Sequence, residues 1–221
     1  MNTPKFVPLS YREYPVRTMK KRAVIFRSEM QQRRSVRQFS GRPVPRDINE
    51  EILRTGNSAP SGANAQPWHF VVVSDPQLKQ QIREGAEKTE KEYYQDHAVD
   101  DLIDALKPIG TEPEKPFLEA APYLVVVFCK TCSAATDGHR VKNHYVKESV
   151  GIAVGMLIAA VQHAGLACLT YTPTRMNFLN RLLQRPRWET PNMILVVGYP
   201  AEDAQVPDLE KKSLEQVATF L

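Results

Sequence analysis

Three arginines and one serine lie within five consecutive residues, Arg33–Arg37, the densest group of cationic side chains in the sequence. Each guanidinium presents a planar fork of N–H donors that fits the oxygens of a phosphate. Three such forks and a hydroxyl could therefore enclose one terminal phosphate. An ordinary solvated basic turn has the same composition, so the motif alone leaves both interpretations open.

A loop of small residues, Ala59–Asn64, is a second candidate. Side chains this small allow a flat ligand to approach the backbone closely. A plain connecting loop would have the same composition, so the two interpretations are equally supported.

A third candidate combines a carboxylate, a phenol and an ammonium group. Glu90 and Tyr94 are four residues apart in a polar helical stretch and share one face of that helix, and Lys115 follows in a proline-rich segment. The carboxylate could pair with an α-ammonium group and the lysine with an α-carboxylate, so the three could hold an amino-acid zwitterion. Charged residues are frequent here, and spacing alone favours a solvated helix face.

Familiar catalytic and metal-binding motifs are missing. The sequence contains no G-x-G-x-x-G, P-loop, H-E-x-x-H or G-x-S-x-G pattern. Cys129 and Cys132 form a C-x-x-C pair, but a structural zinc site needs four ligands and no second pair exists. We therefore expect no metal site and interpret the cysteines as incidental.

Composition and charge narrow the class of protein. The 221 residues are 42% hydrophobic and 24% charged, which is typical of a globular domain. The net charge of +4 favours a local anion site over a nucleic-acid-binding face. Residues Met1–Tyr14 lack the apolar core of a signal peptide, and the apolar stretch Val150–Val161 is shorter than the roughly 20 residues that cross a bilayer. We expect a soluble, cytoplasmic protein without nucleic-acid or membrane partners.

Helices and strands alternate in a way that indicates an α+β fold, with a mixed central sheet flanked by helices. The pattern predicts helices at 17–33, 47–57, 76–94, 142–165 and 177–184, with a further helical stretch at 96–107. It predicts strands at 69–73, 123–128, 166–171 and 193–199, loops at 58–67 and 107–116, and a polar tail at 201–221. Between Gly151 and Ala160 the long helix is apolar on nearly every side, so it is buried either in the domain or between subunits.

These motifs together resemble the nitroreductase superfamily of flavoproteins and, within it, the iodotyrosine deiodinase group. The resemblance extends from about Phe6 to Val217. The Arg33–Arg37 run is shared widely in the superfamily and supports FMN binding, whereas the spacing of Glu90, Tyr94 and Lys115 matches the substrate lid of the deiodinases. Further matching stretches are Ala59–Ala63, Pro67–Val73, Thr172-Pro173, Val197–Pro200 and Val206–Leu209.

The resemblance implies one nitroreductase-like domain over residues 1–221, with an N-terminal arm (1–16), a lid (84–116) and a C-terminal extension (201–221). The domain would work as an intertwined homodimer with FMN at the subunit interface. The resemblance assigns the FMN phosphate and ribityl chain to Arg33, Arg34, Ser35, Val36 and Arg37, and the flavin plane to Pro60, Ser61 and Gly62 of the other subunit. Thr170, Tyr171 and Thr172 match the segment beside the isoalloxazine, with Thr172 as the catalytic residue that donates to flavin N5.

Two positions depart from the mammalian members of the group. Tyr171 replaces a threonine, and its bulk is expected to alter packing at the flavin edge. Lys211 replaces an arginine that reaches FMN, and it keeps the charge but loses the fork of donors.

The implied activity is FMN-dependent reductive dehalogenation of halotyrosines, which releases tyrosine and halide. Glu90, Tyr94 and Lys115 would hold the zwitterion, the backbone of Ala63 would receive the phenolate oxygen, and NADPH or a reductase would supply electrons. Two alternatives remain. A general nitroreductase or flavin reductase of the same fold would not need the lid triad, and a non-catalytic FMN-binding protein would have no use for an amino-acid lid.

Overall fold

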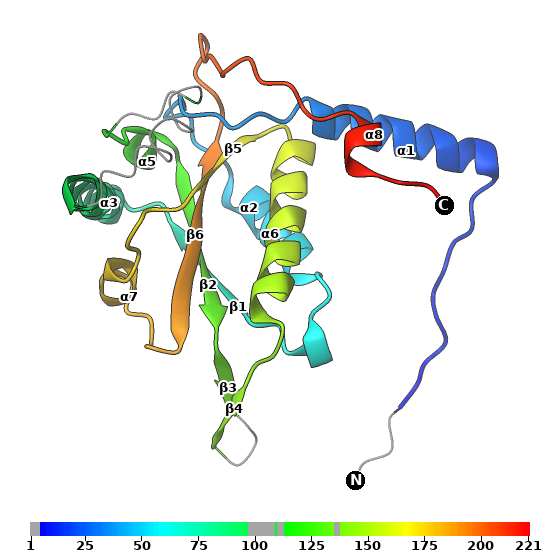
Figure 1. Ribbon diagram of the computed structural model, residues 1–221, viewed down its shortest axis with the longest axis horizontal. Helices are drawn as coiled ribbons and strands as arrows, with labels where there is room; N and C mark the ends of the chain where they lie inside the picture. Colours follow the sequence, from blue (N-terminus) through cyan, green and yellow to red (C-terminus); the bar gives the residue numbers. More distant parts are fainter. Residues whose placement is uncertain (1–4, 97–108, 110–112, 135–137) are drawn as a thin grey trace. The chain divides into compact units, whose positions relative to one another are not determined.

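The computed structural model describes residues 5–96, 109, 113–134 and 138–221 (Figure 1). The chain divides into two compact units, residues 1–33 and residues 34–221. The first unit contains α1 (Val16–Gln31), which confirms the predicted helix and has no buried residue. The single domain expected over residues 1–221 stays a prediction.

The second unit is built on a sheet of four antiparallel strands in the order β1-β2-β6-β5. These strands are β1 (Trp68–Val73), β2 (Tyr123–Lys130), β6 (Glu189–Gly198) and β5 (Ala167–Tyr171). The six residues Leu124–Cys129 of β2 are all buried, because the strand is central and both faces of the sheet are covered. A parallel bridge between Ser35 and Cys168 extends the sheet at its β5 edge.

Helices cover both faces of this sheet, as the α+β pattern predicts (Figure 1). One face packs against α3 (Pro76–Asp96), α5 (Phe117–Ala120) and α7 (Phe178–Leu182). The other packs against α2 (Arg46–Asn57) and α6 (Val146–His163). A Cβ on Gly56 of α2 would lie 2.4 Å from Leu157 Cδ2 of α6, so the absence of a side chain there permits the close approach of the two helices.

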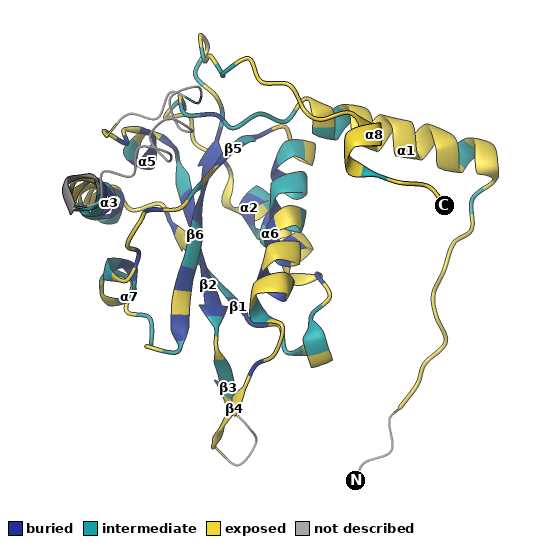
Figure 2. Cartoon of the chain, viewed as in Figure 1, coloured by how far each residue is buried: buried dark blue, intermediate teal, exposed yellow. Residues whose placement is uncertain are grey.

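The apolar helix α6 has a buried face and an open face within this chain (Figure 2). Val150, Leu157 and Val161 are among its fully buried residues. Ile152 is 46% exposed, and a Cβ on Gly151 or Gly155 would meet no atom within 4 Å. The inner face is therefore core, and the outer apolar face is uncovered.

The structure differs from the predicted elements in a few places. Helix α6 begins at Val146 instead of 142, because Arg140–Lys142 forms strand β4 of a hairpin with β3 (Cys132–Ala134). Helix α5 lies between the predicted loop and the predicted strand at 123–128, where no element was predicted, and the four-residue helix α8 (Leu214–Val217) lies in the predicted polar tail. The predicted helical stretch at 96–107 lies outside the described residues from residue 97 on, and so does half of the predicted 107–116 loop.

Across the parts of the chain that the structure describes, no group of three or more potential ligands could hold a metal ion, and none of the three cysteines takes part in a disulfide bond. No helix within the same residues has both the length and the hydropathy needed to cross a bilayer.

Candidate active site

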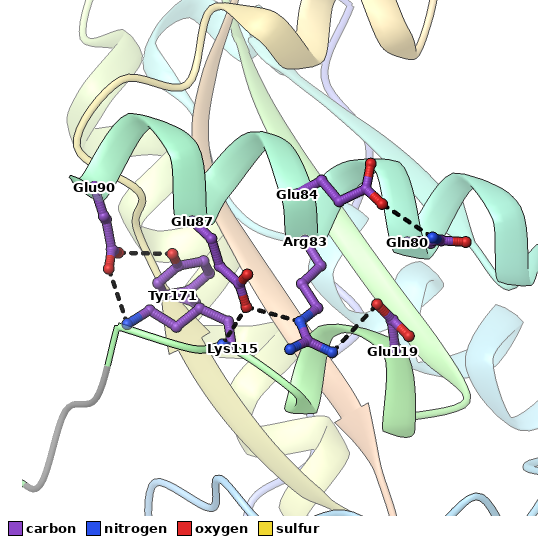
Figure 3. A network of polar contacts seen from close by, with 8 residues as sticks. All are labelled: Gln80, Arg83, Glu84, Glu87, Glu90, Lys115, Glu119 and Tyr171. Atoms are coloured by element: carbon purple, nitrogen blue, oxygen red, sulfur yellow. Dashed lines mark hydrogen bonds and ion pairs between the residues drawn. The ribbon is translucent and has the colours of Figure 1, made fainter. Parts of the chain in front are cut away.

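Glu90 and Lys115, two of the three residues predicted to hold a zwitterion, lie together in the structure (Figure 3). Lys115 Nζ is 2.8 Å from Glu90 Oε2, and the two side chains are 6% and 10% exposed. A buried ion pair needs close geometry and further hydrogen bonds to offset desolvation. The hydroxyl of Tyr171 supplies one, because it donates to Glu90 Oε1 at 2.7 Å.

Tyr94, the third predicted member, lies in α3, but its side chain is outside the described residues. The structure therefore brings Glu90 and Lys115 together and leaves the role of Tyr94 a prediction.

Glu87, one turn before Glu90 on α3, fixes the backbone of Lys115. Its Oε1 accepts from the Lys115 N–H at 2.6 Å and from Arg83 Nε at 2.7 Å. Burial raises the pKa of Glu87, but these two hydrogen bonds and the Arg83 charge outweigh burial and leave the pKa below its ordinary value. The ionised Glu87 side chain therefore holds the backbone of Lys115 close to α3.

Lys79, further back on the same helix, contacts α5. Its Nζ donates to the carbonyl oxygens of Glu119 and Ala121, each at 2.8 Å, and so satisfies acceptors at the end of the short helix. Burial lowers the pKa of Lys79, and the nearby Glu119 charge opposes this only partly. The polar face of α3 thus contacts the segment from Lys115 to Ala121 at several points. Figure 3 shows the contacts made by Arg83, Glu87 and Glu90.

Tyr171 links this lid region to the end of strand β5. Its ring meets Phe117 edge to face, with 5.4 Å between the centroids, and Lys115 Nζ lies 6.0 Å from its centroid. The sequence-based interpretation placed Tyr171 beside the flavin and gave it no contact with Glu90. Because 81 residues separate the two in the chain, no local spacing could have revealed this bond.

The arginine run begins at the boundary between the two units, with Arg33 in the first and Arg34–Arg37 in the second. Ser35 bridges to Cys168 of β5, and the N–H of Val36 donates to the Cys168 carbonyl at 3.3 Å. Arg34 Nη2 donates to the carbonyl of Pro207. Burial lowers the pKa of Arg37 from its ordinary value.

The residues around β5 fit a phosphate-bearing cofactor. Arg34 and Arg37 supply cationic donors, and Ser35 adds a hydroxyl on the segment that runs beside β5. At the other end of β5, Thr170 and Thr172 are exposed, so their hydroxyls are accessible to a ligand. Lys211 is exposed in the C-terminal segment, and its predicted contact with FMN stays a prediction.

The small-residue loop lies against the start of α6. The N–H of Gly62 donates to Ser149 Oγ at 3.3 Å, and a Cβ on Gly62 would lie 2.7 Å from the Tyr145 ring. Ala63 has a φ of 52°, in the left-handed region that L-residues seldom adopt. Backbone strain of this kind collects at ligand-binding sites, which agrees with a role for this loop.

The loop and the Ser35–Val36 segment lie at opposite ends of the sheet. Trp68, which follows the loop, pairs with Cys129, and Cys129 pairs with Thr190 of β6. Cys168, which the arginine run contacts, pairs with Val197 of β6. The stretch Thr190–Val197 is roughly 20 Å long at about 3.3 Å per residue. The two predicted halves of the FMN site are therefore separated within one chain.

Comparison with known proteins places these residues in context. A model of the nitroreductase family matches residues 30–199. The iodotyrosine deiodinase of Haliscomenobacter hydrossis is 49% identical over 95% of this chain and 94% of its own length. That of Nematostella vectensis is 41% identical over 90% of this chain and 76% of its own length.

A solved structure gives the same result in three dimensions. A crystal structure of oxidized iodotyrosine deiodinase bound to FMN and 3-iodo-L-tyrosine superposes with a TM-score of 0.73 at 32% sequence identity. The match covers 88% of this chain and 100% of that one.

Proposed function

The chain belongs to the nitroreductase family, and we propose from this premise that it is an FMN-dependent oxidoreductase that removes halide from halotyrosines. The reaction takes up two electrons and one proton: the carbon–halogen bond breaks, the halogen leaves as halide, and the ring carbon is protonated. FMN, when bound and reduced, supplies the two electrons for this step. The observation that carries the proposal is the buried Glu90–Lys115 pair at the end of β5.

The buried pair suits an amino-acid zwitterion. Each member already faces a partner of the charge that the substrate would bring, since Glu90 faces an ammonium group and Lys115 faces a carboxylate. A bound substrate could separate Glu90 from Lys115 without leaving either charge unpaired. Its ammonium group would pair with Glu90, and its carboxylate would pair with Lys115. The cost of desolvating the two side chains has already been met in folding. A nitroaromatic or a simple phenol offers no such exchange.

The arginine segment and the end of β5 form the proposed FMN half-site. Arg34, Ser35 and Arg37 would hold the phosphate by charge-assisted hydrogen bonds. Thr172 would then lie beside the reactive edge of the flavin, next to Tyr171, which contacts Glu90. This arrangement brings the substrate's amino-acid group and the flavin edge to the same end of one strand.

The second half-site comes from another copy of the chain. The loop Pro60–Ala63 lies roughly 20 Å along the sheet from the residues that contact β5, so one chain cannot close around a single flavin. The open apolar face of α6, with Ile152 and the bare backbone at Gly151 and Gly155, suits a second copy. A homodimer with two shared FMN sites accounts for both features. A donor of the NADPH or reductase type and a cytoplasmic location stay predictions.

Comparison of two ligands on the wild-type FMN protein tests the proposed substrate class. Iodotyrosine and 2-iodophenol share the halogenated phenol, but iodotyrosine also carries the zwitterion. Quenching of FMN fluorescence should give a dissociation constant at least tenfold lower for iodotyrosine. Equal affinities would mean that the Glu90–Lys115 pair is structural, and a general nitroreductase would then be the better description.

A further inference from the structure

We propose that Tyr171 is a positioning residue that holds Glu90 for the ammonium group of the substrate. The inference rests on the proposed function, because it assumes that Glu90 receives this group. It assigns to Tyr171 a role in substrate selection that does not require contact with the substrate or with FMN.

The two oxygens of Glu90 have different partners. Oε1 accepts from the Tyr171 hydroxyl at 2.7 Å, and Oε2 faces Lys115 Nζ at 2.8 Å (Figure 3). A carboxylate with one oxygen held by a neutral donor keeps the other oxygen directed to a cation. Lys115 Nζ and the substrate's α-ammonium are the same kind of donor, so Oε2 is the oxygen that the two exchange.

Tyr171 is well suited to act as the fixed point of this arrangement. It is the last residue of β5 and pairs with Ile194, which is fully buried in the central sheet. Its ring packs against Phe117, and its side chain has only two rotatable torsions before the hydroxyl. Glu90 has three torsions and stands on α3, so its carboxylate depends on an outside contact for its direction.

The hydrogen bond from Tyr171 to Glu90 matters most when the Glu90–Lys115 ion pair separates. When the substrate enters, Lys115 leaves Glu90 Oε2 for the substrate carboxylate, and one of the two strong contacts of Glu90 is broken. Without the Tyr171 hydroxyl, the carboxylate would be free to follow the lysine or to turn toward water. With the Tyr171 hydroxyl in place, Oε2 stays at the position where the ammonium group binds. Substrate binding then costs less conformational entropy, because the Glu90 side chain is already ordered.

Tyr171→Phe is the direct test, because it removes the hydroxyl and keeps the ring that contacts Phe117. Tyr123→Phe is the matched control, since Tyr123 packs with the core on the opposite face of the sheet. Dissociation constants for iodotyrosine and 2-iodophenol are measured by calorimetry on wild type and both variants. The urea midpoint of each ligand-free protein is measured alongside.

Tyr171→Phe should bind iodotyrosine about tenfold more weakly, as expected for a lost hydrogen bond to a charged group. Its affinity for 2-iodophenol should change less than twofold, and KM for iodotyrosine should rise by a larger factor than kcat falls. In a Glu90→Gln background the same substitution should have little further effect on iodotyrosine binding, because the two side chains act as one unit.

Three outcomes are distinguishable. Equal affinity of wild type for the two ligands would defeat the proposed function itself. If wild type discriminates and Tyr171→Phe discriminates equally well, the inference about Tyr171 is wrong and the function stands. If the substitution weakens both ligands alike, or acts fully in the Glu90→Gln background, the hydroxyl shapes the site in general and does not position Glu90.

Discussion

Glu90→Gln should weaken halotyrosine binding strongly and preserve the local hydrogen-bond geometry. The amide keeps an oxygen that can accept from Tyr171, but it places an uncharged group opposite Lys115 Nζ. Two unit charges 2.8 Å apart attract by about 6 kcal/mol at an effective dielectric constant of about 20. Desolvation offsets part of this attraction, and loss of one member of a buried pair costs about 3–5 kcal/mol. We expect the loss of the Glu90 charge to cost about 3 kcal/mol, the lower end of this range, because the hydrogen bond from Tyr171 survives.

This loss should be visible in two measurements on the FMN protein. Urea unfolding should show a lower free energy of unfolding, because the buried Lys115 loses the negative charge that Glu90 places 2.8 Å from its Nζ. Quenching of FMN fluorescence should show a dissociation constant for iodotyrosine raised about 100-fold, which corresponds to about 2.7 kcal/mol. The affinity for 2-iodophenol should change little.

Two further variants separate binding from stability. Glu84→Gln removes the same charge from the exposed side of α3, where Glu84 accepts from Gln80, and it should change neither quantity appreciably. The double variant Glu90→Gln/Lys115→Met removes both buried charges and should recover much of the stability but not the binding. Unaltered iodotyrosine affinity in Glu90→Gln, or recovered affinity in the double variant, would refute the assignment of Glu90 to the ammonium group.

Two other predictions concern the sheet and the FMN half-site. Glu189 makes a bidentate ion pair with Arg185, with N–O distances of 2.7 and 2.9 Å. Burial raises the pKa of Glu189, but the hydrogen bond and charge of Arg185 and the charge of His69 lower it more strongly. The pKa in the folded state therefore lies below the ordinary 4.5. The stabilising contribution of the ionised Glu189 is complete above about pH 4.5, and it is lost as the pH falls through the folded-state pKa. The difference in urea midpoint between wild type and Glu189→Gln should therefore be largest near neutral pH and should disappear in acid. Arg34→Ala should weaken FMN retention by about 1.5–3 kcal/mol, seen as loss of flavin absorbance on dialysis, and full retention would show that Arg34 serves only its contact with Pro207.

The elements that depend on local pattern could be predicted from the sequence. Helix α2 has a clear apolar stripe that includes Ile52, and β2 is a continuous apolar run, so both were predicted within a few residues of their bounds. The hairpin β3–β4 was missed because its six residues include only one large apolar side chain, Val141. Short polar strands of this kind carry almost no periodic signal.

In the candidate site, too, the contacts within one helix could be predicted from the sequence, whereas the contacts between distant segments could not. Arg83, Glu87 and Glu90 are spaced four and three residues apart, and this common helix face could have been found from the sequence. The bond from Tyr171 to Glu90 could not, because it depends on how the end of β5 packs against α3. The proposed cofactor and substrate class follow from the family resemblance, whereas the pairing of Glu90 with Lys115 required the fold.

The distance along β6 between the arginine run and the Pro60–Ala63 loop has a genetic consequence if two chains share each flavin. A chain altered at Arg34 loses its own half of one site but still offers an intact loop to its neighbour. A chain altered at Gly62 does the reverse. Each would be inactive as a population of its own, yet co-expression would produce mixed pairs in which one of the two sites is built entirely from undamaged halves.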